Sequence, residues 1–174
     1  SYGTSLTVAP LSLAIPADFY TDGVNDEVEI NQAIFQASQA GGGTIRLATG
    51  TYTLGAPIEM RSKINLVGNA SGKGVAKDTS LVVKDQFNGN MEGIIDFTAV
   101  GNSSRNVIQN LNISGNRANQ SSGVISGIHT GSDNRHYSSN QILIRRVGIF
   151  SCSQYGINFD KNTQHVILTN CTIG

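Results

Sequence analysis

The sequence predicts an all-β fold, a parallel β-helix in which short strands wind into stacked coils. Three segments in the second half of the chain share one pattern: a polar residue, an apolar one, a small or polar one, and a second apolar one. The apolar pairs are Leu111/Ile113, Val147/Ile149 and Cys171/Ile173. Successive copies begin 36 and 24 residues apart. A period near 24, with an insertion in one repeat, is typical of a solenoid whose inward side chains stack from coil to coil.

A helix near the N-terminus would supply the cap that an exposed end of stacked strands requires. We expect residues 1–20 to be an extended lead-in and residues 26–40 to be this helix, with Asn25 or Asp26 at its start. Apolar residues recur there at helical spacing, and three glycines follow: Ile30, Ala33, Ile34 and Ala37, then Gly41, Gly42 and Gly43. The pattern predicts a short capping α-helix over the first coil.

The remaining residues, 44–174, are expected to form the coils of one β-helix domain, or of the N-terminal part of one. Alternating apolar segments predict strands at 44–47, 51–54, 57–60, 63–67, 80–83 and 93–97. The stretch 69–79 is expected to be a corner loop. The insertion spans roughly 114–140 and is expected to form long loops, which on a rigid scaffold tend to carry function.

Composition excludes several classes of function. The 174 residues are 39% hydrophobic, enough for a core, but only 14% charged, against roughly 25% in typical soluble domains. The net charge is zero, so electrostatics favours neither a nucleic-acid partner nor an anionic membrane. No apolar run is long enough to span a membrane. Uncharged polar residues and 20 glycines suit the repeated turns of an extracellular protein.

The two cysteines leave their redox state open. Cys171 occupies the inward position held by Leu111 and Val147, which favours a buried thiol. Cys152 precedes Cys171 by less than one period, so the two are not expected to stack, and only geometry can decide a disulfide. After Ile173 and Gly174 the sequence offers no closing helix. We therefore expect the open coil to continue in a longer solenoid or to assemble with another chain, including a second copy.

Several segments carry a family resemblance. Asp22–Glu27, Ile30–Ile34, Ala40–Ile45 and Gly50–Tyr52 resemble, in this order, the opening of the pectate-lyase-like right-handed β-helix superfamily. Leu111–Asn119 and Tyr155-Gly156 are similar, more narrowly, to the catalytic module of mannuronan C5-epimerases. The resemblance implies a right-handed β-helix, a polysaccharide or cell-surface glycan as partner, and a location outside the cell, at the cell surface or on a virion.

Lysis or epimerisation at C5 of a uronic acid needs a group that neutralises the substrate carboxylate, a base and an acid. The similar epimerases present a Tyr-Gly-Phe-Asp-Pro-His-Glu run and a lysine from an earlier loop. Tyr155 matches this run directly and Asp160 matches after two inserted residues, whereas Lys161 or Asn162 stands near the place of the histidine. The lysine position falls at about Gly123.

Stacked coils could instead assemble a replacement set from the insertion and the following coil. We expect the catalytic candidates to be Tyr155, Asp160, Lys161 and His136. The substrate-binding candidates are Arg117, Asp133, Arg135 and Tyr137. The alternative is a solvated loop tip with ordinary charges.

No cofactor or resident metal is expected. The three histidines lack the spacing of a transition-metal site, and we interpret His129 as structural and His165 as an outward residue of a strand. Calcium could bind through Asp96, Asp133 or Asp160, but these carboxylates are far apart in the sequence.

Two functions remain open from the sequence. The departure from the epimerase run and the low charge favour a non-catalytic structural or glycan-binding module, such as part of a phage tail or spike, a surface layer or an adhesin. The alternative is a polysaccharide lyase or C5-epimerase acting on an acidic glycan.

Overall fold

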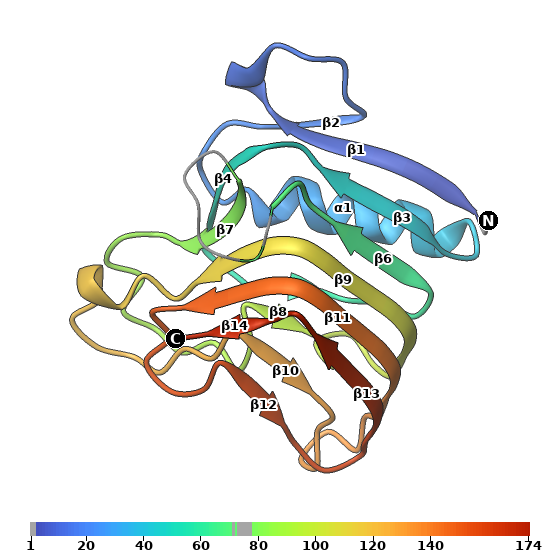
Figure 1. Cartoon of the computed structure of the whole chain (residues 1–174), viewed down its shortest axis with the longest axis vertical. Coiled ribbons are helices and arrows are strands. Elements are labelled where there is room, and N and C mark those ends of the chain that lie inside the picture. The colour runs from blue at the N-terminus through green and yellow to red at the C-terminus, as the bar shows by residue number, and fades with distance from the viewer. Residues whose placement is uncertain (1–2, 71, 73–77) are drawn as a thin grey trace.

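The structure, a computed structural model, describes residues 3–70, 72 and 78–174 and is a right-handed parallel β-helix, as the sequence predicts (Figure 1). Its strands form a ten-stranded sheet, the main sheet, and a four-stranded sheet, the small sheet. The main sheet comprises β1 (Thr4–Pro10), β2 (Phe19–Thr21), β3 (Gly43–Leu47), β4 (Gly50–Leu54), β6 (Ile64–Val67), β7 (Thr79–Val83), β9 (Ser103–Ser114), β11 (Ser139–Phe150), β13 (Thr163–Thr169) and β14 (Thr172–Ile173). The small sheet comprises β5 (Ile58–Glu59), β8 (Ile95–Asp96), β10 (Ile128–Thr130) and β12 (Ile157–Phe159).

The core is built from columns of inward side chains, because parallel strands in register place equivalent residues above one another. One column of the main sheet runs through Leu6, Ile45, Leu66, Ile108, Ile144 and Leu168. The column of the small sheet runs through Ile58, Ile95, Ile128 and Ile157. Full burial of each such side chain stabilises the fold by about 1.5–3 kcal/mol. Inward residues of the last coil remain open, since Leu168 is 39% and Ile173 55% exposed.

The repeated pattern of the sequence marks a corner of each coil. The apolar residues Leu111, Ile113, Val147 and Ile149 are fully buried, which confirms that they point inward. The polar residue before each pair, at 110, 146 and 170, has a positive φ of 59°, 50° and 53°. This left-handed conformation bends β9 and β11 between their two halves. Asparagine adopts it more readily than most residues.

The predicted capping helix is confirmed as α1 (Glu27–Gln39), which lies beside β1 and β3 (Figure 1). Its buried face is the predicted one, with Ile30, Ala33, Ile34 and Ala37 fully covered. The helix ends where Gly41 and Gly42 take φ values of 93° and 119°. Asp26 lies at the N-cap but does not cap through its side chain. Its carboxylate instead accepts hydrogen bonds from the backbone N–H groups of Gly23 and Thr53, both at 2.8 Å.

The structure differs from the sequence prediction at two places. Residues 1–20 are not merely a lead-in, because β1 pairs with β3 and the main sheet therefore begins at Thr4; η1 (Leu11–Leu13) follows β1. The insertion over 114–140 contains η2 (Arg117–Asn119) and β10, so it includes part of an ordinary coil. Most of the expected corner loop 69–79 lies outside the described residues. Among the described helices none is long and apolar enough to cross a membrane.

Candidate functional site

The outer face of the small sheet carries one column of polar residues. Because side chains alternate along a strand, the residues after the inward isoleucines of β5, β8, β10 and β12 point outward. In register these are Glu59, Asp96, His129 and Asn158. Four different polar groups, two of them acidic and one a histidine, are thus stacked on neighbouring coils.

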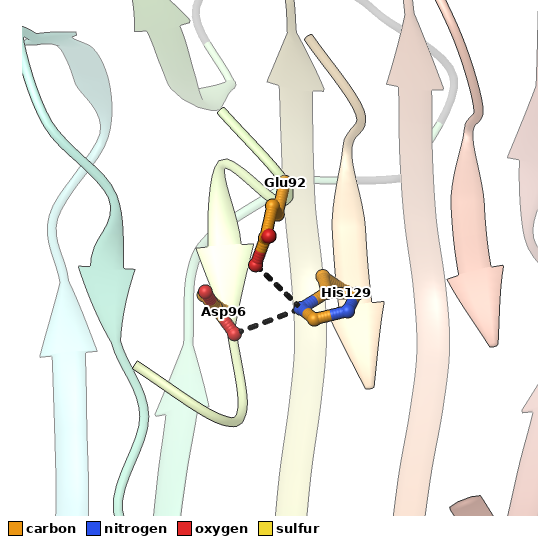
Figure 2. A group of neighbouring side chains, drawn as sticks. All are labelled: Glu92, Asp96 and His129. Atoms are coloured by element: carbon orange, nitrogen blue, oxygen red, sulfur yellow. Dashed lines mark hydrogen bonds and ion pairs between the residues drawn. The ribbon is translucent and has the colours of Figure 1, made fainter. Parts of the chain in front are cut away.

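Asp96 and His129 form a buried pair at the centre of this column. The Oδ1 atom of Asp96 lies 3.1 Å from Nδ1 of His129 and accepts hydrogen bonds from the backbone N–H (2.8 Å) and the hydroxyl (2.9 Å) of Thr98. Asp96 is 5% and His129 2% exposed. Figure 2 shows the carboxylates of Glu92 and Asp96 directed at the same imidazole nitrogen, with Glu92 Oε2 at 3.8 Å.

The pair favours the charged form of each group. Burial raises the pKa of Asp96, but hydrogen bonds from His129 and Thr98 and the charge of His129 outweigh it and leave the pKa below its ordinary value. Burial lowers the pKa of His129, but the hydrogen bond and charge of Asp96, helped by Glu92, outweigh it and raise the pKa. Hydrogen bonding that favours a charged form shifts a pKa in this way. His129 is therefore protonated over a wider range of pH than an ordinary histidine.

A tight turn after β10 carries Arg135 across the pair. Reciprocal backbone hydrogen bonds between Ser132 and Tyr137, at 2.9 and 3.1 Å, close this turn. The Nη2 atom of Arg135 donates to Glu92 Oε2 at 2.7 Å and to the Thr98 hydroxyl at 2.8 Å, and lies 3.6 Å from Asp96 Oδ2. The guanidinium thus offsets the negative charge of the two carboxylates that face His129.

The following coil brings a third carboxylate to the free side of the imidazole. Asp160 Oδ2 lies 3.9 Å from His129 Nε2, and the Asp160 side chain is 37% exposed. Next to it, Lys161 Nζ is 2.9 Å from Asp133 Oδ2, and this hydrogen bond raises the pKa of the Lys161 ammonium. A buried proton donor and a partly exposed acceptor therefore face each other.

Glu92, Asp96 and His129 could also hold a metal ion, since one ligand atom from each lies within 4.8 Å of the others. The guanidinium of Arg135 already provides the positive charge at that point. A cation would have to displace it. The expected calcium ligands do not converge, because Asp96 faces His129 whereas Asp133 pairs with Lys161.

The structure gathers part of the site set that the sequence predicts. Asp133, Arg135, Asp160 and Lys161 lie around His129. Within the described residues, four candidates have no side-chain hydrogen bond or ion pair with this cluster: Arg117 on η2, His136 and Tyr137 on the turn, and Tyr155, which is 50% exposed.

Sequence reasoning missed Asp96, Glu92 and Thr98 as partners of His129. The available signal was an Ile-Asp, an Ile-His and an Ile-Asn pair at corresponding places of successive coils. The interpretation of His165 as an outward residue is confirmed, since it is exposed and its Nδ1 lies 3.0 Å from Asn140 Oδ1. Both cysteines are free thiols.

Comparison with known proteins identifies the family of this chain. The family model for rhamnogalacturonase A/epimerase, pectate lyase-like, matches residues 19–174. The chain belongs to this pectate-lyase-like family. It is also 31% identical over 160 residues to mannuronan C5-epimerase AlgE1 of Azotobacter vinelandii, covering 85% of this chain and 11% of that protein. Alginate lyase 7 of the same organism is 30% identical over 158 residues, covering 85% of this chain and 17% of that protein.

Solved structures agree with this assignment. The A-module of mannuronan C-5 epimerase AlgE6 of Azotobacter vinelandii superposes with a TM-score of 0.72 at 26% identity, covering 88% of this chain and 42% of that module. The AlgE4 A-module of the same organism gives 0.69 at 25% identity, covering 95% and 43%. This pectate-lyase-like chain therefore spans less than half of the modules it resembles.

Proposed function

We propose that this chain belongs to a polysaccharide-modifying enzyme, a lyase or C5-epimerase, that acts on an acidic glycan outside the cell. The arrangement of Asp96, His129 and Asp160 on the outer face of the small sheet carries the proposal. The relatives named as epimerases and a lyase support the same reaction class.

The residues can supply the three groups that the chemistry needs. The Asp160 carboxylate accepts the proton from C5, breaking the C5–H bond and leaving the electron pair delocalised into the substrate carboxyl group. Protonated His129, oriented by Asp96, then donates a proton. If the proton goes to the oxygen at C4, the C4–O bond breaks and an unsaturated sugar forms. If it returns to C5 on the opposite face, the product is the epimer.

Arg135 supplies the charge that neutralises the substrate carboxylate in this scheme. His129 is only 2% exposed, and the partly exposed Asp160 lies on the Nε2 side of its ring, so a substrate approaches Nε2 from the side of Asp160. To bind the substrate carboxylate, Arg135 exchanges Glu92 and Thr98 for it. Lys161, beside Asp160, is a second cation near the same point.

A non-catalytic glycan-binding or structural module, for example in a tail spike, surface layer or adhesin, is the second candidate. The burial of His129 and the ion pairs already formed by Arg135 and Lys161 favour it, since a closed charge network can serve the fold alone. In that case the column stabilises the small sheet and no substrate touches the imidazole.

Incubation with polymannuronate, polyguluronate and polygalacturonate separates the two candidates. Ultraviolet absorbance reports the unsaturated product and proton NMR the epimer ratio. We expect conversion that falls about 100- to 10,000-fold in His129→Gln and in Asp160→Asn, and that stays unchanged in His165→Gln. Conversion that survives both site variants would exclude the catalytic roles. Binding without conversion of any of these glycans would support the non-catalytic module.

A further inference from the structure

Charge is divided between the two sheets although the chain is neutral. Within the described strands, the main sheet contains no Asp or Glu, whereas the small sheet contains Glu59 and Asp96. The strands of the main sheet carry arginines instead, at positions 46, 105, 145 and 146. The charged side chains of the main-sheet strands are thus all basic, although the chain is neutral.

Three of its cations gather on three successive coils. Arg46 lies on β3, Lys63 immediately precedes β6, and Arg105 lies on β9. Lys63 and Arg105 hold equivalent corner positions with φ values of 62° and 59°. The backbone of Lys63 is tied to both neighbouring coils, since its N–H donates to Ser104 O at 2.8 Å and its carbonyl accepts from Gly43 N–H at 3.0 Å. The corner therefore presents its side chains from a rigid backbone.

These cations border a hollow of about 680 Å³, which we call the basic groove. Glycines at positions 3, 41 and 43 also line it. A Cβ atom on Gly43 would lie 2.1 Å from Thr4 O, so the close approach of the first two coils requires this glycine. Three uncharged residues that can donate and accept hydrogen bonds line the same hollow: Ser5, Thr44 and Asn65.

The three cations are free to bind a ligand. Arg46, Lys63 and Arg105 are all exposed. Across residues 3–70, 72 and 78–174, none of them forms an ion pair, whereas Arg135 and Lys161 near the candidate site do. Unpaired cations on a rigid surface attract an anion without first breaking an internal pair.

We propose that the basic groove is a second binding surface, on a different sheet from the candidate site, for a carboxylate-bearing polysaccharide. The location of this surface follows from the geometry alone, whereas the choice of an acidic polysaccharide as ligand rests on the proposed function. Sparse cations separated by hydroxyl and amide groups suit a sugar chain that alternates carboxylates with hydroxyls. A nucleic-acid duplex carries one phosphate about every 1.7 Å, a much denser charge than three cations match. Proteins that bind single strands stack the bases on aromatic side chains. Among the described residues that line the groove, none has an aromatic side chain.

The binding test uses calorimetry with polygalacturonate and polymannuronate at low salt. Each exposed cation is expected to contribute about 1.5- to 5-fold in affinity. The triple variant Arg46→Gln/Lys63→Gln/Arg105→Gln should therefore bind on the order of ten-fold more weakly, and added salt should weaken the wild type. Lys84→Gln, at an exposed lysine outside the groove, is the matched control for Lys63→Gln and should bind as the wild type. Highly methyl-esterified polygalacturonate, the same polymer without its charge, should not bind.

Amide NMR shifts locate the bound polymer. Signals of Thr44 and Asn65 should move during the titration, also in a His129→Gln background where the candidate site is altered. Unchanged Thr44 and Asn65 signals, equal losses in Lys63→Gln and Lys84→Gln, or tighter binding of a DNA oligonucleotide would each overturn the proposal. Circular dichroism checks that the variants fold, and the single variants serve if the triple one does not.

The two proposals fail in different ways. Binding in the groove without conversion of any glycan would overturn the proposed enzyme alone. Conversion with unchanged binding in the triple variant would overturn the basic groove alone.

Discussion

Replacing Asp96 by asparagine tests whether the buried pair is charged as the structure indicates. Asparagine can still accept from Thr98, so the variant mainly loses the negative charge facing His129 at 3.1 Å and Arg135 at 3.6 Å. A hydrogen bond to a charged group contributes about 1.5–3 kcal/mol. We expect Asp96→Asn to lower the free energy of unfolding by about that amount near pH 5.5.

The two pKa shifts predict how the stability loss of Asp96→Asn changes with pH. The pKa of His129 is raised by folding, so its contribution is complete below the unfolded value of about 6.5 and is lost as pH rises through the folded value. The pKa of Asp96 is lowered, so its contribution is present above about 3.9 and is lost as pH falls through the folded value. The deficit of the variant should therefore be largest between about pH 4 and 6.5 and smaller near pH 9.

Urea unfolding followed by circular dichroism at about pH 5.5 and about pH 9 measures this difference, and imidazole NMR titration follows His129 directly. Asp85→Asn is the matched control. Asp85 is exposed and accepts one hydrogen bond from Asn116, at 2.7 Å, so its change should stay within about 0.5 kcal/mol. A deficit that grows toward pH 9, or an unchanged pKa of His129 in the variant, would refute the charged pair.

Three further predictions concern the scaffold. Tyr52 is fully buried and its hydroxyl lies within hydrogen-bond distance of two backbone carbonyls, so Tyr52→Phe should lower the free energy of unfolding by about 1–2 kcal/mol. Tyr20→Phe, at an exposed ring, is the control and should lower it less, and urea unfolding compares the two variants. A Cβ at Gly127 would lie 2.5 Å from a backbone oxygen of the next coil, so Gly127→Ala should lower the free energy of unfolding by about 1–3 kcal/mol. Gly174→Ala, the control, should leave it nearly unchanged, and similar thermal midpoints of the two variants would contradict this. Burial raises the pKa of the Cys152 thiol, so thiol-reagent labelling at neutral pH should be slower in the native than in the urea-unfolded protein, and equal rates would show that the thiol is not protected.

Inward positions of this protein could be predicted from the sequence because burial selects for apolar residues. The pairs around Leu111 and Val147 point inward as expected, and the helix covers the first coils with the residues that its spacing indicates. The strand β1 was missed because a single short strand with two nearby prolines has no repeat that marks it.

Outward positions follow no such rule. Asp96 and His129 are 33 residues apart, and corner lengths vary from coil to coil, so no fixed period aligns them. Asp133 and Arg135 could be predicted as neighbours of the site because they lie in the insertion, but their partners could not. The same limit hid the basic groove, whose three cations come from three coils.

The sequence alone was enough to predict the β-helix, its capping helix and its inward columns. Burial selects apolar residues at the same position of each coil, so these positions form a repeat in the sequence. Only the tertiary structure decided which polar side chains meet on the outside. That choice depends on the register between coils of unequal length, which places a buried Asp96–His129 pair on one sheet and, on the other, three cations that form no ion pair within the described part of the chain.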